Sequence, residues 1–100
     1  MVKHIVVWRL RDSAHGNTRE QNAQIIKSKL ESLSGKIPGM VKIEVGVNYS
    51  ETADSADIVL YSEFETKSDL DSYQAHPEHK AIMPFVAEAK SERRMVDYEV

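Results

Sequence analysis

The sequence contains no cysteine, and this absence removes several kinds of chemistry. Disulfide bonds, zinc sites built from thiolates and thiol nucleophiles are all excluded. A chain without disulfides suits a reducing compartment, and Met1–His4 runs straight into a strand-like segment with no signal-peptide pattern, so we expect a cytoplasmic protein. No apolar run approaches the ~18 residues that a membrane-spanning helix requires, so we expect no membrane partner.

Clustered positive charge is also missing. The 13 Lys and Arg residues stand against 16 Asp and Glu residues, which gives a net charge of −3. The nearest approach to a basic patch is Arg93-Arg94, and it is flanked by Glu92 and Asp97. Domains that bind nucleic acid present a clustered positive face interleaved with aromatic residues. We therefore expect no nucleic-acid partner.

What the chain does contain is a regular hydrophobic pattern without repeats or linkers, so we treat residues 1–100 as a single domain. Apolar residues alternating with polar ones predict strands over 2–10, 40–48, 58–65 and 95–100. A helix over 17–34 is predicted by apolar residues at helical spacing. This apolar stripe consists of Ile26, Leu30, Leu33 and Ile37. The order of elements is completed by a second helical region, which starts at 66–68.

This second helical region is interrupted by prolines. The residue before a proline is pushed out of the α region, so the helix should stop near Ala75, ahead of His76-Pro77. Pro77 suits the first position of a new helix, and Pro84 should kink or restart it. The resulting order β-α-β-β-α-β predicts an α+β fold of the ferredoxin-like type.

Two helices can cover only one face of a four-stranded sheet. We expect the other face to be apolar too, with His4, Val6, Trp8 and Leu10 pointing toward a partner beside a row formed by Val41, Ile43, Val45 and Val47. Such a patch is larger than monomers usually expose, which predicts a homodimer with two sheets face to face, a dimeric α/β barrel. The alternative is a monomer that uses the face as a ligand platform.

Several motifs are similar to those of the stress-responsive dimeric A/B barrel (Dabb) family. They are the opening VKHIVVWRL with its histidine at position 4, the IPGM turn at 37–40, and the run DLDSYQAHPEH from Asp69 to His79. The resemblance implies a ferredoxin-like protomer that dimerises through its sheet and encloses a small cavity. It also implies a structural cation in some relatives, held by backbone carbonyls that correspond here to Ser34, Ile37 and Met40.

The candidate site consists of two histidines and a tyrosine. A histidine in the first turn of a helix is disfavoured as imidazolium, so His79 should stay neutral and can act as a general base. Tyr73 can exchange hydrogen bonds beside it, and His4 can orient a carbonyl group. We expect Val6 and Trp8 to line the same ligand cavity. The alternative is structural: His4 and His79 tie strand 2–10 to the second helical region, and His76 serves only as a helix end.

The resemblance extends to members that cyclise polyketides. It implies that His79 removes a proton α to a carbonyl while Tyr73 and His4 stabilise the enolate. A second tyrosine of that pattern is absent, since Lys29 occupies the corresponding place.

A metal site would need His76 and His79, which are three residues apart, to point at one ion. Pro77 lies between them and breaks the helical face that would direct both rings to that ion. We therefore expect no metal and no cofactor.

Three functions stay open. The first is a homodimer, linked to stress, that binds a small, partly apolar molecule without turnover. The second is a cyclase-like enzyme in which His79 and Tyr73 perform acid–base chemistry. The third is a cofactor-free monooxygenase of the wider dimeric-barrel superfamily, although the HPEH run favours the Dabb branch.

Overall fold

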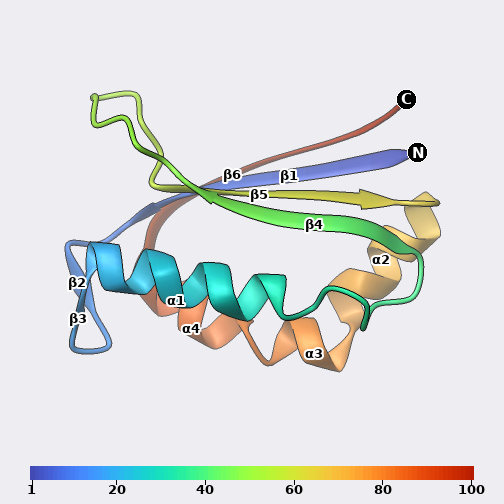
Figure 1. Ribbon diagram of the computed structural model, residues 1–100, viewed down its shortest axis with the longest axis horizontal. Helices are drawn as coiled ribbons and strands as arrows, with labels where there is room; N and C mark the ends of the chain where they lie inside the picture. The colour runs from blue at the N-terminus through green and yellow to red at the C-terminus, as the bar shows by residue number, and fades with distance from the viewer.

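The computed structural model describes residues 1–100, and Figure 1 shows a sheet with every helix on one side of it. The elements are β1 (Val2–Leu10), β2 (Ser13–Ala14), β3 (Asn17–Thr18), α1 (Arg19–Glu31), β4 (Met40–Val47), β5 (Ile58–Phe64), α2 (Lys67–Ala75), α3 (Pro77–Lys80), α4 (Met83–Ala89) and β6 (Lys90–Glu99). The main sheet has the order β4-β5-β1-β6, with all neighbours antiparallel. The predicted ferredoxin-like α+β fold is confirmed.

Side-chain caps set the helix ends. Thr18 caps α1 by accepting a hydrogen bond from the Gln21 amide, and the Gln21 side chain accepts one from the Thr18 amide in return. This capping box starts α1 two residues later than predicted, and the helix gives way to turns after Glu31. At the second helical region His76 caps α3 through its ring Nδ1, which accepts from the Glu78 amide, and Pro77 takes the first helical position.

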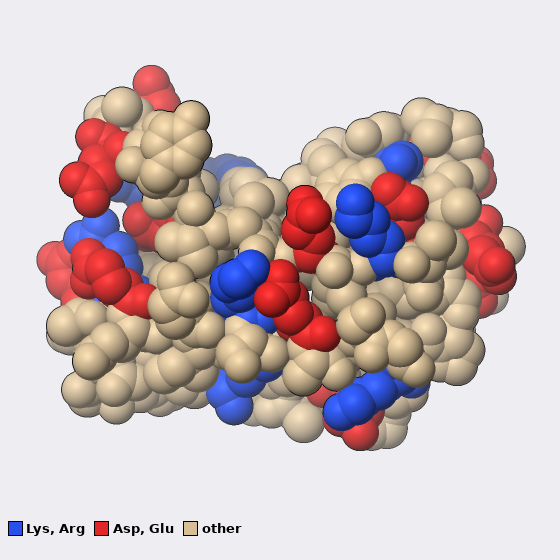
Figure 2. Space-filling view, viewed as in Figure 1, with Lys and Arg blue, Asp and Glu red and all other residues tan.

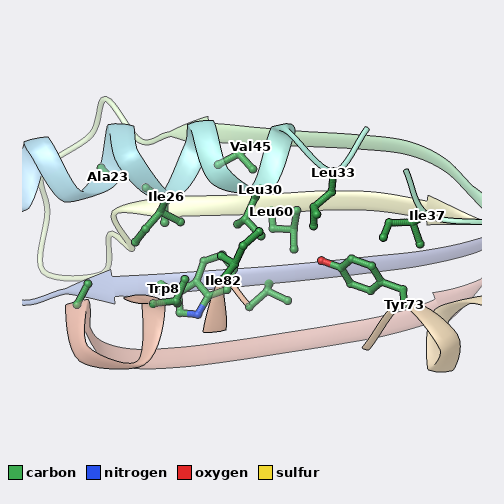
Figure 3. Close-up of a cluster of buried hydrophobic side chains, with 14 of the residues drawn as sticks. Trp8, Ala23, Ile26, Leu30, Leu33, Ile37, Val45, Leu60, Tyr73 and Ile82 are labelled. Atoms are coloured by element: carbon green, nitrogen blue, oxygen red, sulfur yellow. The ribbon is translucent and has the colours of Figure 1, made fainter. Parts of the chain in front are cut away.

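The core lies between the helices and one face of the sheet. The helical stripe of α1 and the following turn is buried, with Ile26 and Leu30 0% exposed. From the sheet the core receives Val6 of β1, which is 1% exposed, and Figure 3 shows Trp8 of β1 and Leu60 of β5 in the same cluster. These residues share a face because β1 and β5 pair Val6 with Leu60, and side chains alternate along a strand.

The expected partner-facing side of β1 was therefore wrong. His4, Val6, Trp8 and Leu10 point toward the helices of their own chain and are buried. The row predicted on β4 is also not an open apolar face: Val45, which pairs with Leu60, is 1% exposed and belongs to the core. The reason is that both faces of β1 carry apolar side chains, so alternation alone does not tell which face the helices cover.

The face of the sheet away from the helices is a mixed surface. Ile5 and Val7 of β1 lie there, half-buried, and Val96 and Tyr98 of β6 lie there 52% and 45% exposed. Charged side chains accompany them: Lys3 donates to the Tyr61 hydroxyl at 2.7 Å and to Glu63 at 3.1 Å. The following set shares this face by register: Lys3, Ile5, Val7, Val59, Tyr61, Glu63, Arg94, Val96 and Tyr98. We call this set the open face.

The last strand, β6, is longer than predicted. It begins at Lys90, five residues before the predicted start, and pairs with β1 from Val2↔Glu99 to Leu10↔Lys90. The segment Ser91–Arg94 has no apolar residue, so it carries no hydrophobic pattern. It is a strand because β1 supplies its backbone partners, and as an edge strand it is exposed along most of its length.

The face of the molecule seen in Figure 2 carries both signs of charge and shows no large area of one sign. The longest helix, α1, has 13 residues, and no helix of the structure is long and apolar enough to cross a bilayer.

Candidate functional site

A cavity of about 430 Å³ lies between the sheet and the second helical region, next to β6. Most of its lining is apolar, with Val6 and Trp8 from β1, Leu60 from β5 and Val86 from α4. Its polar lining comes from His4, Tyr73, Gln74, His79, Lys90 and Arg93. A mainly apolar hollow with a few convergent polar groups is the usual form of a small-molecule site.

His4 is held in the wall of this cavity by β6. The residue is 2% exposed, and its ring Nδ1 donates a hydrogen bond to the Asp97 carboxylate on the neighbouring strand. The register places these two residues directly opposite each other. On the other side, the Ser62 hydroxyl donates to the His4 carbonyl at 3.1 Å. Because Asp97 accepts from Nδ1, the other ring nitrogen, Nε2, is the one left to interact with a ligand.

Tyr73 of α2 brings a buried hydroxyl to the same cavity. The residue is 0% exposed, and no protein atom accepts a hydrogen bond from its hydroxyl. Figure 3 shows this hydroxyl pointing into the core. Burial raises the pKa of Tyr73 to about 12, although the nearby positive charge of Arg93 acts in the opposite direction. The phenol is therefore protonated at neutral pH and is a donor without an acceptor.

His79 of α3 packs against Tyr73, with ring centroids 4.5 Å apart. Its Nδ1 lies 3.2 Å from the Gln74 carbonyl oxygen, which can only accept, so Nδ1 carries the hydrogen and Nε2 holds the free lone pair. Burial lowers the pKa of His79 from 6.5, and the positive fields of His4 and Arg93 lower it further, whereas the bond to Gln74 raises it. The ring is neutral at pH 7, as the sequence predicted, but burial rather than a helix dipole is the main cause, because α3 has only four residues.

The structure thus brings together all five residues that the sequence selected. His4, Val6, Trp8, Tyr73 and His79 line one cavity. The structural alternative, in which the His4 ring hydrogen-bonds to the second helical region, does not hold, since the side-chain bond of His4 goes to Asp97 on β6. The rings of His4 and Tyr73 are 6.2 Å apart in an edge-on arrangement, so Tyr73 lies between the two histidines as an aromatic spacer.

Three charged residues of the site escaped the sequence analysis, namely Lys90, Arg93 and Asp97. All three belong to β6. The segment before Met95 has no alternation of apolar and polar residues that would predict a strand. For a charged residue on an exposed strand, the sequence also does not show which face of the sheet its side chain is on. The only available signal is the register with β1, which places Asp97 opposite His4 and Arg93 opposite Trp8.

No group of three or more His, Asp or Glu side chains is arranged to hold a metal ion. His76 is used as the cap of α3, and its ring points to the Glu78 amide. The cation suggested at the turn of Ser34, Ile37 and Met40 stays a prediction. Lys29 does not line the cavity; its ammonium lies 5.3 Å from the centre of the Phe85 ring.

The fold and the cavity define a ferredoxin-like α+β protein of the kind that forms dimeric barrels, and the sequence identifies the family. The stress responsive A/B barrel domain (Dabb) family matches residues 2–100, and the chain belongs to it. No protein of curated function matches the sequence significantly.

Solved structures agree with this assignment. A dimeric protein of unknown function with a ferredoxin-like fold from Bacteroides fragilis is 40% identical, with a TM-score of 0.85 over 99% of this chain and 95% of that one. A dimeric ferredoxin-like protein from Thermobifida fusca is 20% identical, with a TM-score of 0.84 over 99% and 90%. The hydroxynitrile lyase of Passiflora edulis is 17% identical, with a TM-score of 0.81 over 99% and 92%, a likeness of fold alone.

Proposed function

We propose that this protein is a homodimer whose cavity binds a small, partly apolar molecule. The observation that carries the proposal is a largely apolar cavity of about 430 Å³ whose lining includes Tyr73 and His79. The Tyr73 hydroxyl is buried without a protein partner, and the half-buried His79 ring forms its hydrogen bond through Nδ1, which leaves Nε2 free. Buried polar groups are normally hydrogen-bonded, and an unpaired one therefore requires an explanation. A ligand that accepts from Tyr73 and donates to His79 supplies one.

The binding proposal is tested by a thermal-shift screen of small aromatic and aliphatic carbonyl compounds. The screen compares wild type with His79→Ala and with Lys80→Ala, a change at an exposed neighbour on the same helix. We expect compounds that raise the melting temperature of wild type and Lys80→Ala but act less on His79→Ala. Hits that stabilise all three proteins equally would show that His79 takes no part in binding, and a screen without hits would count against the cavity as a binding site.

Acid–base chemistry is the second candidate function, and the state of His79 favours it. A neutral imidazole with its lone pair on Nε2 can accept a proton from a carbon next to a carbonyl. The C–H bond breaks, its electron pair moves to the carbonyl oxygen as an enolate, and the protonated phenol of Tyr73 donates to that oxygen. His4, fixed by Asp97, would position the substrate.

This chemistry has a direct readout in the exchange of α-hydrogens for deuterium, followed by NMR on a ketone found in the screen. Exchange that depends on wild-type protein and is lost in His79→Gln supports catalysis. Binding without any exchange leaves the protein as a binder. The cofactor-free monooxygenase stays a prediction that no feature of the cavity favours.

Dimerisation through the open face is the other part of the proposal. The exposed Val96 and Tyr98 and the half-buried Ile5 and Val7 form an apolar area on this face, and the relatives from B. fragilis and T. fusca are described as dimeric. Light scattering should give twice the chain mass of 11.4 kDa.

Val7→Asp places a charge in this face and should produce monomers, whereas Gln24→Asp on the exposed side of α1 should not. A wild-type monomer at micromolar concentration would contradict the proposal.

A further inference from the structure

The charge of the cavity lining is one-sided. Two permanently charged side chains line it, Lys90 and Arg93, and both are cationic; no Asp or Glu is among the lining residues. The chain as a whole has a net charge of −3, so a lining without carboxylates does not follow from composition. Asp97 is close by, but its carboxylate is engaged with His4.

Neither cation has an ionic partner within the chain. The lysines and arginines that form ion pairs do so elsewhere, for example Lys3 with Glu63 and Lys27 with Glu31. Lys90 makes no side-chain hydrogen bond or salt bridge, and Arg93 makes only a weak contact with the Met95 sulfur at 3.7 Å. The Lys90 ammonium therefore keeps all of its donors for a ligand, and the Arg93 guanidinium keeps all but the one that faces Met95.

The cations and the buried apolar lining occupy different parts of the cavity wall. Arg93 and Lys90 come from β6, the exposed edge of the sheet, together with the apolar Met95, which is 47% exposed. The buried apolar residues of the lining come from β1, β5, α1 and α4; they are Val6, Trp8, Leu60, Leu30 and Val86. Arg93 lies opposite Trp8 in the register. The cavity thus has a cationic side toward solvent and an apolar interior.

The field of Arg93 reaches the proposed ligand-binding groups. It acts to lower the pKa of both Tyr73 and His79. An anion bound at Arg93 would therefore lie within electrostatic range of these two rings. Guanidinium is also the side chain best suited to a planar carboxylate, because its fork of N–H groups matches the two oxygens.

From this arrangement we propose that the ligand is a small amphiphilic carboxylic acid whose carboxylate binds Arg93, assisted by Lys90, and whose apolar body lies between Trp8, Leu60 and Val86. The inference rests on the proposed binding function and specifies its ligand class. An apolar acid satisfies the unpaired cations at the edge and fills the apolar interior at the same time. A neutral ligand of equal size would leave both cations without a partner.

The test compares an acid with its uncharged isostere. Titration calorimetry at low ionic strength measures the binding of 4-phenylbutyric acid and 4-phenylbutyramide to the wild-type protein. We expect the acid to bind about tenfold more tightly, the low end for a charge-assisted hydrogen bond, because Arg93 is exposed and solvent screens it. This ratio is measured within one protein and does not depend on the folding of a variant.

Variants then assign the effect to Arg93. Arg93→Gln should remove most of the preference for the acid, with Lys90 retaining the remainder, and should leave the affinity for the amide unchanged. Arg93→Lys should keep most of the acid affinity. The matched control is Arg94→Gln, which removes the same charge one residue further on, from the open face, and should keep the acid preference. Light scattering of every variant verifies that the oligomeric state is unchanged.

The outcomes separate this inference from the binding proposal. Equal binding of acid and amide overturns the acidic ligand, and an acid preference that survives undiminished in Arg93→Gln overturns the role of Arg93; in both cases the cavity remains a binding site. Absence of binding by both probes at millimolar concentration overturns the ligand class, and the carbonyl screen then decides on the binding function separately.

Discussion

The unpartnered hydroxyl of Tyr73 leads to a prediction whose sign is unusual, because Tyr73→Phe should stabilise the protein. Burying a hydroxyl without a hydrogen bond costs about 1–3 kcal/mol by mutational data. Here the hydroxyl is shielded from solvent and no protein atom accepts from it. Phenylalanine removes this cost and keeps the ring contacts with Phe64 and His79, whose centroids are 5.2 Å and 4.5 Å away. After allowance for the small void left by the oxygen, we expect a gain of about 1 kcal/mol.

Tyr61 supplies the control with the opposite sign. Its hydroxyl accepts from Lys3 at 2.7 Å and donates to Glu63 at 2.5 Å. Tyr61→Phe removes both bonds but leaves the direct contact between Lys3 and Glu63 at 3.1 Å. Because the cluster is only half-buried, we expect a loss of about 0.5–1.5 kcal/mol. The same chemical change at two tyrosines is thus expected to shift stability in opposite directions.

Urea and thermal unfolding at one fixed protein concentration measure both effects, since the stability of a dimer depends on concentration. A change of 1 kcal/mol shifts the melting temperature of a domain this size by about 4–8 °C. Tyr73→Phe should also weaken ligand binding, because the donor is lost. A Tyr73→Phe protein that is less stable than wild type would refute the reasoning, since it would mean that the hydroxyl has a partner in solution, such as an ordered water.

Two other perturbations follow from the structure. Folding lowers the pKa of His79, so the unfolded chain binds more protons than the folded one below pH 6.5. The free energy of unfolding should therefore fall as the pH drops below this value. Urea titrations of His79→Gln should show a smaller fall. Gly39→Ala should cost about 2–3 kcal/mol in the same assay, because φ is +79° and the new Cβ would lie 2.2 Å from Cγ of Asp69. Gly35→Ala, with φ of +78° and open space, should cost only about 1 kcal/mol, and equal losses at both glycines would contradict the steric explanation.

Most of the fold could be predicted because its elements carry their own local signals. The stripe from Ile26 to Ile37 is buried as its spacing indicated, and the chain leaves the helix before Pro77 and restarts there. Pairing with a neighbour, by contrast, leaves no local signal. The first five residues of β6, from Lys90, are a strand only because β1 lies beside them.

Which face of β1 is buried is likewise determined by tertiary packing and not by local sequence. Ile5 and Val7 would suit the core as well as Val6 and Trp8 do, and only the position of the helices separates the two pairs.

The candidate site divides in the same way. The sequence indicated His4, Tyr73 and His79 because histidine and tyrosine have chemistry that is independent of where they lie. It could not indicate Arg93 or Asp97, because charged residues on an exposed strand are common and their importance here depends on the register. The carboxylate of Asp97 matters only because it meets a histidine that is 2% exposed.

The strand β6 connects the two halves of the proposed function. Its side chains alternate, so Arg93, Met95 and Asp97 lie on the helix side while Arg94, Val96 and Tyr98 lie on the open face. As an edge strand β6 pairs with β1 alone, and its exposed residues make it the least buried strand of the sheet. A second protomer packed on Val96 and Tyr98 would fix the same backbone that carries the cationic wall of the cavity. Dimerisation through the open face would therefore preorganise the site on the opposite side of the strand.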